Sequence, residues 1–313
     1  MSRIIIAGQC HETLIEQLKK YNKDIVHEPN IDYNGLLELV TTAEGIIATT
    51  RTAIDQHMLD EAKELKWIGR LGSGMDMIDV DYATSKGITC INSPEGNCNA
   101  VAEHVMGLLL NLKNRITKSF LEIRQGIWSR DANRGDEIFG STVGIIGYGN
   151  TGKALAEKLK GFNVKVLAYD KYLTSYGDGA YVTKSDLATI QQEADIISFH
   201  VPLTEETFHY ANEAFFSGLK KQPYFINACR GKVTDTAALI NALKTGKIKA
   251  AGLDVLENEL LDSYTQEEKE QLGWLLHQDN VIITPHIAGY SVRSSYQMSF
   301  VLANKIIDKF YRD

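Results

Sequence analysis

The feature that most constrains the fold is a glycine motif in the middle of the chain. Residues 147–152 read Gly-Tyr-Gly-Asn-Thr-Gly, directly after the apolar run 142–146 and before a helix-compatible segment, 153–160. Alone, the pattern could mark an ordinary tight turn. Between a strand and a helix, it lets backbone N–H groups approach a pyrophosphate, whose charge rests on the start of the helix. The motif therefore predicts a dinucleotide site whose contacts are Gly147, Gly149, Asn150, Thr151 and Gly152.

A carboxylate at the end of the next apolar run narrows the ligand. The run 164–169 ends at Asp170, 18 residues after Gly152. A carboxylate at that distance accepts hydrogen bonds from the hydroxyls of an adenosine ribose. It would also repel a 2′-phosphate, and the two residues that follow include one cation, Lys171, and no arginine. We therefore expect NAD rather than NADP, in preference to an Asp that merely ends a strand.

Size, charge and cysteine spacing bound the class of protein. The 313 residues exceed the usual size of one domain, so two domains are expected. A net charge of −7 without a long Lys/Arg run argues against nucleic acid or an anionic membrane as the main partner. The apolar run 105–110 is too short to span a bilayer, and no leader precedes the first strand, so we expect a cytoplasmic protein. Four cysteines without CxxC spacing fit reduced thiols and give little support to a metal site: Cys10, Cys90, Cys98 and Cys229.

Short β-branched runs alternate with amphipathic stretches along the chain, which predicts a doubly wound α/β architecture. The strands expected before the glycine motif are 4–7, 25–27, 46–49, 67–71 and 88–91, with helices such as 11–20 and 35–42 between them. Those expected from the motif onward are 143–146, 164–169, 196–200, 224–227, 249–253 and 281–284. Two strand sets of similar size suggest two parallel-sheet domains with a ligand in the cleft between them.

The remaining segments are helical or polar. Residues 100–127 are largely helical in pattern, and a polar link, 129–136, follows. Near the other end, apolar residues from Val292 to Phe310 recur at spacings of three and four, which predicts an amphipathic closing helix. Composition does not decide which domain this helix joins.

Groups suited to acid–base chemistry follow three later strands. A hydride-transfer reaction needs an acid or base for the substrate oxygen and a cation for an attached carboxylate. Such groups occur in the segments 227–231, 252–259 and 285–289. Ligands of open parallel sheets bind beyond the carboxyl ends of the strands, so these are the positions to expect.

Together these segments resemble the D-isomer-specific 2-hydroxyacid dehydrogenase family over essentially the whole chain. The resemblance rests on the glycine motif with Asp170, His200-Val201-Pro202-Leu203-Thr204, Asn227–Gly231, Gly252–Glu259 and Pro285–Gly289. It implies a Rossmann NAD-binding domain at 99–289. It also implies a discontinuous, flavodoxin-like substrate domain at 1–98 and 290–313, which the closing helix rejoins, and a homodimer to which the 100–127 region contributes.

The resemblance implies that Arg230, Glu259 and His286 are the catalytic set. Arg230 offers a planar donor fork for the substrate carboxylate and can polarise the adjacent carbonyl. His286 can donate a proton when a 2-oxo acid is reduced and take one in the reverse direction. Glu259, in contact with His286, would favour the imidazolium and fix the ring. A surface arginine and a structural histidine are the plain alternatives.

The sequence departs from the family pattern beside Glu259. Leu260 stands where the family usually has Pro, and the acidic stretch 262–270 is longer than usual. Glu257 therefore stays open as the partner of His286.

The resemblance implies further contacts to the cofactor. His200, placed before Val201-Pro202, suggests a wall of the cofactor pocket. Cys229 could make the site sensitive to oxidants, although a buried structural thiol is the simpler interpretation. Beyond the glycine motif and Asp170, the expected contacts are His200, Val201, Pro202, Thr207, Ala228, Cys229, Asp254 and Gly289.

The first half holds the remaining substrate residues. Residues 71–76 resemble the family's glycine-rich substrate loop, whose backbone N–H groups could bind the carboxylate. With Arg51, Arg70 and the segment 92–97, the loop resembles the phosphoglycerate dehydrogenase branch, and two arginines would suit a phosphorylated substrate. Arginines turned to solvent are an equal alternative. The expected substrate contacts are Arg51, Ser73, Gly74, Asn97, Arg230 and His286.

We therefore expect an NAD-dependent D-2-hydroxyacid dehydrogenase, with 3-phosphoglycerate the leading substrate and hydroxypyruvate or glyoxylate reduction the alternative. A non-catalytic, NADH-sensing corepressor of the same fold is less favoured, because it would need interaction tails. The chain ends after its closing helix, so control by an added regulatory domain is not expected.

Overall fold

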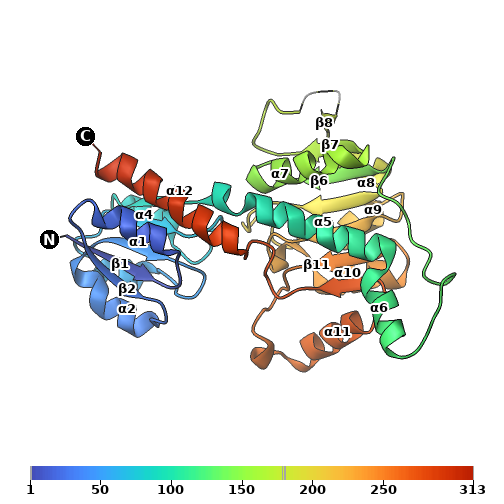
Figure 1. Cartoon of the computed structure of the whole chain (residues 1–313), viewed down its shortest axis with the longest axis horizontal. Coiled ribbons are helices and arrows are strands. Elements are labelled where there is room, and N and C mark those ends of the chain that lie inside the picture. The colour runs from blue at the N-terminus through green and yellow to red at the C-terminus, as the bar shows by residue number, and fades with distance from the viewer. Residues whose placement is uncertain (1, 178, 180, 313) are drawn as a thin grey trace. The chain divides into compact units, whose positions relative to one another are not determined.

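The chain folds into two compact units, which Figure 1 colours by residue number. The computed structural model describes residues 2–177, 179 and 181–312. Unit 1 comprises Met1–Asn99 and Tyr290–Asp313, and unit 2 comprises Ala100–Gly289. Residues 1 and 313, the outer ends of the expected domain ranges, lie outside the described residues.

Unit 1 is a parallel sheet with helices packed on it. Within the described residues its five strands follow the order β2-β1-β3-β4-β5, which is the flavodoxin-like order. The strands are β1 (Arg3–Ala7), β2 (Asp24–Glu28), β3 (Ala43–Ala48), β4 (Trp67–Arg70) and β5 (Thr89–Asn92). The helices are α1 (Glu12–Lys19), α2 (Tyr33–Leu39), α3 (Gln56–Glu61), α4 (Val80–Ser85) and α12 (Val292–Phe310), with 3₁₀ turns η1 (Val40–Thr42) and η2 (Pro94–Gly96).

The closing helix α12 joins unit 1. Ser291 caps the first turn of α12. The apolar face of the helix packs against β4, where Leu302 and Ile306 cover Gly69. It also packs against α1, beside which it lies in Figure 1. The apolar face therefore finds its partner in the sheet formed by the first part of the chain.

Unit 2 is a larger parallel sheet. Within the described residues its order is β12-β11-β10-β9-β6-β7-β8, a doubly wound sheet whose order reverses between β6 and β9. The strands are β6 (Thr142–Ile146), β7 (Lys165–Tyr169), β8 (Val182–Lys184), β9 (Ile196–Phe199), β10 (Tyr224–Asn227), β11 (Ala250–Leu253) and β12 (Val281–Ile283). The helices are α5 (Cys98–Asn114), whose first two residues belong to unit 1, α6 (Ile116–Arg124), α7 (Asn150–Leu159), α8 (Leu187–Glu193), α9 (Glu213–Gly218), α10 (Thr236–Lys244) and α11 (Gln266–Leu276). The 3₁₀ turns are η3 (Lys160–Phe162), η4 (Gly231–Val233) and η5 (Leu261–Ser263).

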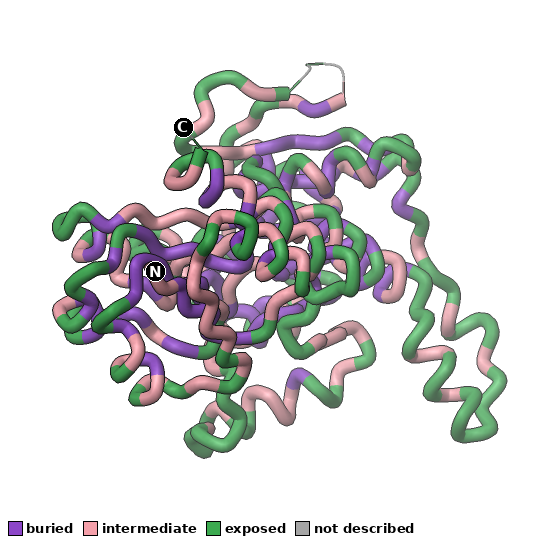
Figure 2. Tube along the Cα trace, turned by 60° about the vertical axis from the view of Figure 1, so that its left-hand side comes forward, coloured by how far each residue is buried: buried purple, intermediate pink, exposed green. Residues whose placement is uncertain are grey.

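Parallel pairing brings the loops of unit 2 that matter most to one edge. Every strand pair in this sheet is parallel, so the loops that follow the strands share the carboxyl edge. The central strands β6, β9, β10 and β11 are buried almost throughout. Figure 2 colours the buried residues of the chain purple. The expected fold class, two parallel-sheet α/β domains, is confirmed.

The sequence reading missed β8. This strand has three residues, of which only Val182 is buried, so no alternation of apolar and polar residues marks it. The other strand bounds differ from the expected ones by three residues or fewer, because pairing with neighbours extends or trims each apolar run.

Candidate functional site

The first and third glycines of the motif are required by packing within the protein. A Cβ atom added at Gly147 would lie 2.4 Å from the carbonyl oxygen of His200, and Gly147 has a φ of +94°. A Cβ atom added at Gly152 would lie 2.1 Å from the carbonyl oxygen of Gly147. Both positions therefore exclude a larger side chain, which fixes the turn between β6 and α7.

The second glycine has no such internal reason. A Cβ atom added at Gly149 would meet nothing within 4 Å. Gly149 is also the N-cap of α7, and no side chain caps this helix, whereas residues such as Asp186 and Asp235 cap α8 and α10. The N–H groups that open α7 are thus left for an anion, and open space lies at the glycine nearest to them. These residues fit the pyrophosphate of a dinucleotide.

Asp170 is fixed beside the glycine turn. One oxygen of its carboxylate accepts a hydrogen bond from the Tyr148 N–H at 2.9 Å, and the other accepts from the N–H groups of Tyr172 and Leu173 at 3.0 Å. The nearby cation, Lys171, is paired with Glu206. A negative charge therefore stands at the end of β7, and the cation next to it is already partnered.

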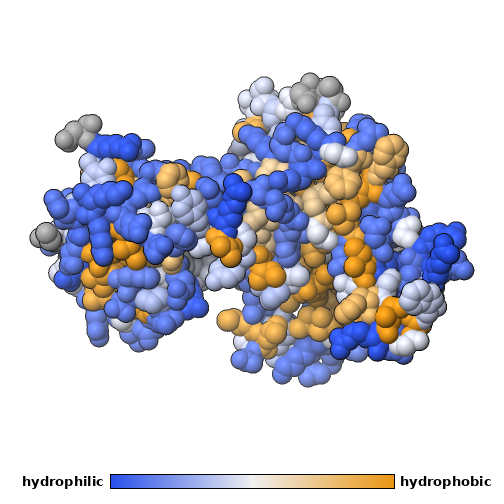
Figure 3. All heavy atoms as spheres, in the orientation of Figure 1, coloured by the Kyte–Doolittle hydropathy of each residue, from blue (hydrophilic) through white to orange (hydrophobic). Residues whose placement is uncertain are grey.

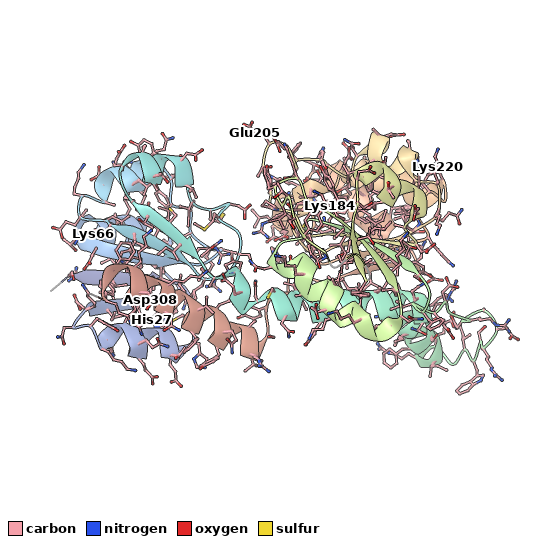
Figure 4. All side chains as sticks on the ribbon, turned by 90° about the horizontal axis from the view of Figure 1, so that it is seen from above. His27, Lys66, Lys184, Glu205, Lys220 and Asp308 are labelled. Carbon is pink, nitrogen blue, oxygen red and sulfur yellow. The ribbon has the colours of Figure 1, made fainter. Side chains whose placement is uncertain are left out.

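The loop after β9 covers the other side of the glycine turn. His200 is buried, its Nε2 lies 2.8 Å from the Ser198 hydroxyl, and burial lowers its pKa to about 4. Val201 approaches Gly147, whereas the Thr207 hydroxyl donates to the Pro202 carbonyl oxygen within the loop. Glu205, labelled in Figure 4, belongs to the same loop. His200 is thus held neutral against the turn.

The loop after β10 presents Arg230. The buried Asn227 shapes this loop, because its Oδ1 accepts from the Cys229 N–H and its Nδ2 donates to the Arg230 carbonyl oxygen, both at 3.0 Å. Ala228 is buried, and burial raises the pKa of the Cys229 thiol. The Arg230 guanidinium donates to the Cys229 carbonyl oxygen at 2.7 Å. Sequence reasoning did not single out the organising role of Asn227.

Glu259 and His286 meet across two neighbouring loops. The Nδ1 atom of His286, after β12, lies 2.9 Å from Oε2 of Glu259, after β11. Both side chains are about four-tenths exposed (40% and 44%), so solvent and a ligand can reach the pair. The contact orients the ring and engages Nδ1, one of its two titratable nitrogens.

Asp254 organises the backbone around His286. This fully buried carboxylate accepts from the Thr284 hydroxyl at 2.6 Å and from the N–H groups of Ile287 at 2.9 Å and Ala288 at 2.7 Å. Its carbonyl oxygen accepts from the His286 N–H at 2.7 Å, and His286 has a φ of +55°. Asp254 thus holds a left-handed backbone, and Gly289 ends the loop and the unit.

Glu257, the alternative partner of His286, lies in a different contact. Its Oε1 atom lies 2.5 Å from Nε2 of His209, and its Oε2 accepts from the Thr236 N–H at 2.7 Å. In the structure, therefore, Glu259 contacts His286 and Glu257 contacts His209. His209 is not among the expected site residues. It lies 48 positions before Glu257 in the chain, and no sequence motif joins the two residues, whose contact forms only on folding.

The glycine-rich loop of unit 1 follows β4. The Gly72 N–H donates to the Ser93 hydroxyl at 3.1 Å, and Gly72 has a φ of +132°. Asn92 donates to the Ser73 carbonyl oxygen at 2.7 Å, and the Ser73 hydroxyl donates to Asn97 at 2.9 Å. These bonds hold the segment that contains Gly74 at the carboxyl edge of the sheet.

The two arginines of unit 1 differ in exposure. Arg51 is exposed and donates to Asn30 at 3.2 Å. Arg70 is only 6% exposed, and its guanidinium donates to the Leu71 carbonyl oxygen. Arg70 is therefore not turned to solvent, and its guanidinium makes a contact inside the domain.

The described residues also bear on metal binding and on membrane spanning. In that part of the chain, no group of three or more His, Cys, Asp or Glu side chains could hold a metal ion. No helix there is long and apolar enough to cross a membrane.

The fold and the site define a two-domain α/β protein with a dinucleotide-binding sheet edge. Residues 106–288 match the family described as D-isomer specific 2-hydroxyacid dehydrogenase, NAD binding domain. The chain therefore belongs to the D-isomer specific 2-hydroxyacid dehydrogenase family. The match confirms the resemblance seen in the sequence and NAD as the ligand class of unit 2.

Individual relatives carry several names. The chain is 32% identical over 98% of its length to D-3-phosphoglycerate dehydrogenase of Archaeoglobus fulgidus, but it spans only 57% of that protein. It is 34% identical to hydroxypyruvate reductase of Thermotoga maritima, over 90% of this chain and 89% of that one. D-lactate dehydrogenase of Aquifex aeolicus, solved with NAD and lactic acid, has a TM-score of 0.84 and 30% identity over 98% of this chain and 96% of that one.

Proposed function

We propose that the protein is an NAD-linked dehydrogenase that interconverts a D-2-hydroxy acid and its 2-oxo acid. The observation that carries this proposal is the 2.9 Å contact between His286 and Glu259, at the same sheet edge as the glycine turn. Bound NAD would take or supply the hydride. The residues proposed to hold the cofactor are the expected set, with the start of α7 facing the pyrophosphate and Asp170 facing the ribose.

The protein's own groups handle the substrate oxygen and carboxylate. Arg230 binds the carboxylate through two parallel N–H donors and orients the 2-oxo group. During reduction, Nε2 of His286 gives a proton to the carbonyl oxygen, and during oxidation it takes one from the hydroxyl. Glu259 keeps the ring in place and stabilises the imidazolium. In unit 1, the residues proposed to recognise substrate are Arg51, Ser73, Gly74 and Asn97.

For the substrate we propose a short 2-oxo acid, hydroxypyruvate or glyoxylate. Arg70 is turned into its domain, so the pair of arginines that would favour a phosphate is reduced to Arg51. Arg51 is exposed, and this keeps 3-phosphoglycerate as the second candidate. The relatives named hydroxypyruvate reductase and phosphoglycerate dehydrogenase support the two candidates in turn.

A panel of 2-oxo acids with NADH tests both levels of the proposal. Absorbance of NADH is followed with glyoxylate, hydroxypyruvate, pyruvate and 3-phosphohydroxypyruvate. We expect turnover, with the highest kcat/KM for hydroxypyruvate or glyoxylate. Preference for the phosphorylated acid would reverse the substrate order. NADH binding without turnover of any acid would contradict the enzymatic proposal.

We also propose that the protein is a homodimer formed through α6. None of the residues of this helix is buried, and four are large and apolar: Ile116, Phe120, Leu121 and Ile123. Trp128, beyond the helix, is 85% exposed. Figure 3 shows hydrophobic surface over the end of α6, at the lower right. An apolar patch of this kind on a polar surface is typical of a protein–protein interface.

A further inference from the structure

Glu257 is not in the proposed catalytic set, but its carboxylate links the segments that carry Arg230 and Glu259. Glu257 lies between β11 and Glu259 in the chain, and its side chain is 29% exposed. One oxygen accepts from the Thr236 N–H at 2.7 Å, and the other lies 2.5 Å from Nε2 of His209. Glu257 thus connects its own loop to two other segments of the carboxyl edge: the start of α10, directly after the loop that follows β10, and the loop after β9.

The loop after β9 is bound to the loop after β10 through His209. The His209 N–H donates to the Lys232 carbonyl oxygen at 2.8 Å, and its Nδ1 lies 3.9 Å from a carboxylate oxygen of Asp235. His209 has a φ of +48°, a left-handed backbone that few residues other than Gly, Asn, Asp and His adopt. The side chain therefore meets Glu257 from a backbone that is itself tied to the segment after Arg230.

A backbone contact brings the other two loops together. A Cβ atom added at Gly231 would lie 1.7 Å from the carbonyl oxygen of Leu256. The chain around Gly231, next to Arg230, therefore lies directly against the chain around Leu256, next to Glu257. This contact sets the separation of the two loops, and the hydrogen bonds of Glu257 prevent them from sliding past each other.

The geometry points to Glu257 as a positioning residue. We propose that its bonds to His209 and to the Thr236 N–H hold the Arg230 and Glu259 segments in a fixed relation. Arg230 and Glu259 act on different parts of the substrate, so a shift of either loop degrades carboxylate binding and proton transfer together. The effect on turnover rests on the proposed function, whereas the effect on the loops does not.

The surroundings of Glu257 favour a test by truncation. Glu257 and His209 line a cavity of about 260 Å³ with Tyr264, Leu272 and other residues. Polar groups exposed by a shorter side chain can therefore be hydrated, and no tightly packed core is emptied. Because the pair is held by hydrogen bonds rather than by close packing, we expect Glu257→Ala to fold.

Steady-state kinetics with NADH and the best 2-oxo acid is the first measurement. For Glu257→Ala we expect kcat/KM to fall by roughly 10- to 100-fold, with KM raised and kcat lowered, because small misplacements carry costs of this size. The stoichiometry of NADH binding stays that of the wild type, which excludes a loss of folded protein. Glu257→Gln keeps an acceptor for the Thr236 N–H, and we expect it to restore kcat/KM to within about threefold of wild type.

His209→Asn completes a double-mutant cycle. Asn accepts the left-handed backbone but lacks the ring that meets Glu257. If the two side chains act as one unit, the double variant loses little more than Glu257→Ala alone. Glu267→Ala is the matched control, because Glu267 lines the same cavity from the first turn of α11. We expect it to retain the wild-type constants.

Amide hydrogen exchange separates this proposal from the proposed function. In Glu257→Ala we expect faster exchange than in wild type and in Glu267→Ala over residues 229–236 and 255–260. Unchanged exchange there, or kcat/KM within twofold of an active wild type, would overturn the proposal. If the wild type turns over no acid, the proposed function fails and the exchange result alone decides the role of Glu257.

Discussion

At the scale of single residues, His286 is subject to two independent demands. Its ring nitrogen contacts Glu259 at 2.9 Å, and its backbone has a φ of +55°. Outside glycine, a left-handed φ is tolerated best by Asn, Asp and His. The position therefore needs a residue that accepts the left-handed turn after β12 and also presents a ring nitrogen to Glu259.

Replacement of His286 by Asn separates the two demands. Asn keeps the left-handed turn but cannot exchange a proton near neutral pH, so we expect kcat to fall by roughly 10²- to 10⁴-fold. The Kd of NADH, measured by fluorescence, stays within about twofold, because β12, which precedes His286, lies four strands away from β6 and the glycine turn. His277→Asn, at the exposed end of α11, is the control. A kcat within tenfold of wild type would remove His286 from the proton transfer.

Asp170 is the residue proposed to set the choice between NAD and NADP. Lys171 is already paired with Glu206, so a 2′-phosphate would face the Asp170 carboxylate without a free neighbouring cation at that residue. For Asp170→Asn we expect the ratio of Kd values, NADPH over NADH, to fall by at least about tenfold, because like-charge repulsion costs more than about 1.4 kcal/mol. Titration with each dinucleotide checks this. Asp262→Asn, on an exposed turn, keeps the wild-type ratio, and an unchanged ratio in Asp170→Asn would refute the assignment.

The sequence predicts residues that belong to an unusual motif, but it does not predict residues whose role arises only from contacts in the folded chain. The glycine motif and the Pro-His-Ile-Ala-Gly segment combine unusual residues at a strand end, so the sequence indicates them. His209 and Asn227 bear no such mark, because their importance arises from contacts made after folding. For Arg70 the sequence leaves a substrate contact and an outward orientation equally open, and the structure buries the side chain.

At the scale of elements, β9 is followed directly by His200, whose titratable ring is buried at the carboxyl edge of the sheet. Burial lowers the pKa of His200 to about 4 from an ordinary 6.5. Below pH 6.5 His200 is protonated in the unfolded chain, whereas in the folded chain it stays neutral down to about pH 4. Folding stability therefore falls as pH drops through this window, by about 3 kcal/mol in all.

His200→Asn removes this proton uptake. Between pH 7 and pH 4, denaturant unfolding of the cofactor-free protein should show wild type losing about 3 kcal/mol more than the variant. His277→Asn, an exposed histidine, should parallel wild type. Parallel pH dependence of wild type and His200→Asn would show that the ring is not held neutral in the fold.

Most elements could be predicted because their apolar runs are bounded by turn residues. β6 and β10 lie within one residue of the expected ranges, and α12 follows the expected spacing. β8 could not be found, since a three-residue edge strand is defined by its neighbour β7 rather than by its own pattern. The 3₁₀ turns could not be predicted for a similar reason, because such short turns depend on the elements that flank them.

At the scale of the whole molecule, the apolar surface of α6 is the basis of the dimer proposal. We expect Phe120→Glu to raise the dimer dissociation constant by at least about tenfold, because a charge is buried where a ring packed. Sedimentation at several concentrations measures this. Val292→Glu, at a residue that is 93% exposed in unit 1, is the control for a new surface charge. A monomeric wild type, or an unchanged Phe120→Glu dimer, would contradict the proposal.

The discontinuous organisation of unit 1 is a property that composition could not supply. The spacing of apolar residues in α12 requires a hydrophobic partner but is the same for either sheet. The structure shows that partner to be β4 and α1. Which sheet α12 packs on depends on the complementary shapes of the two surfaces, and the spacing of apolar residues in the sequence does not contain this information.

The position of β12 has a consequence for how the molecule responds to heat. This strand has three residues and, within the described chain, is paired only with β11 at the margin of the sheet. Marginal strands open at a lower free energy than the centre of a sheet. Asp254 ties the loop that follows β12 to the end of β11, through its bonds to Thr284, Ile287 and Ala288. We therefore expect warming to release this loop and His286, the proposed proton donor, while most of the domain is still folded.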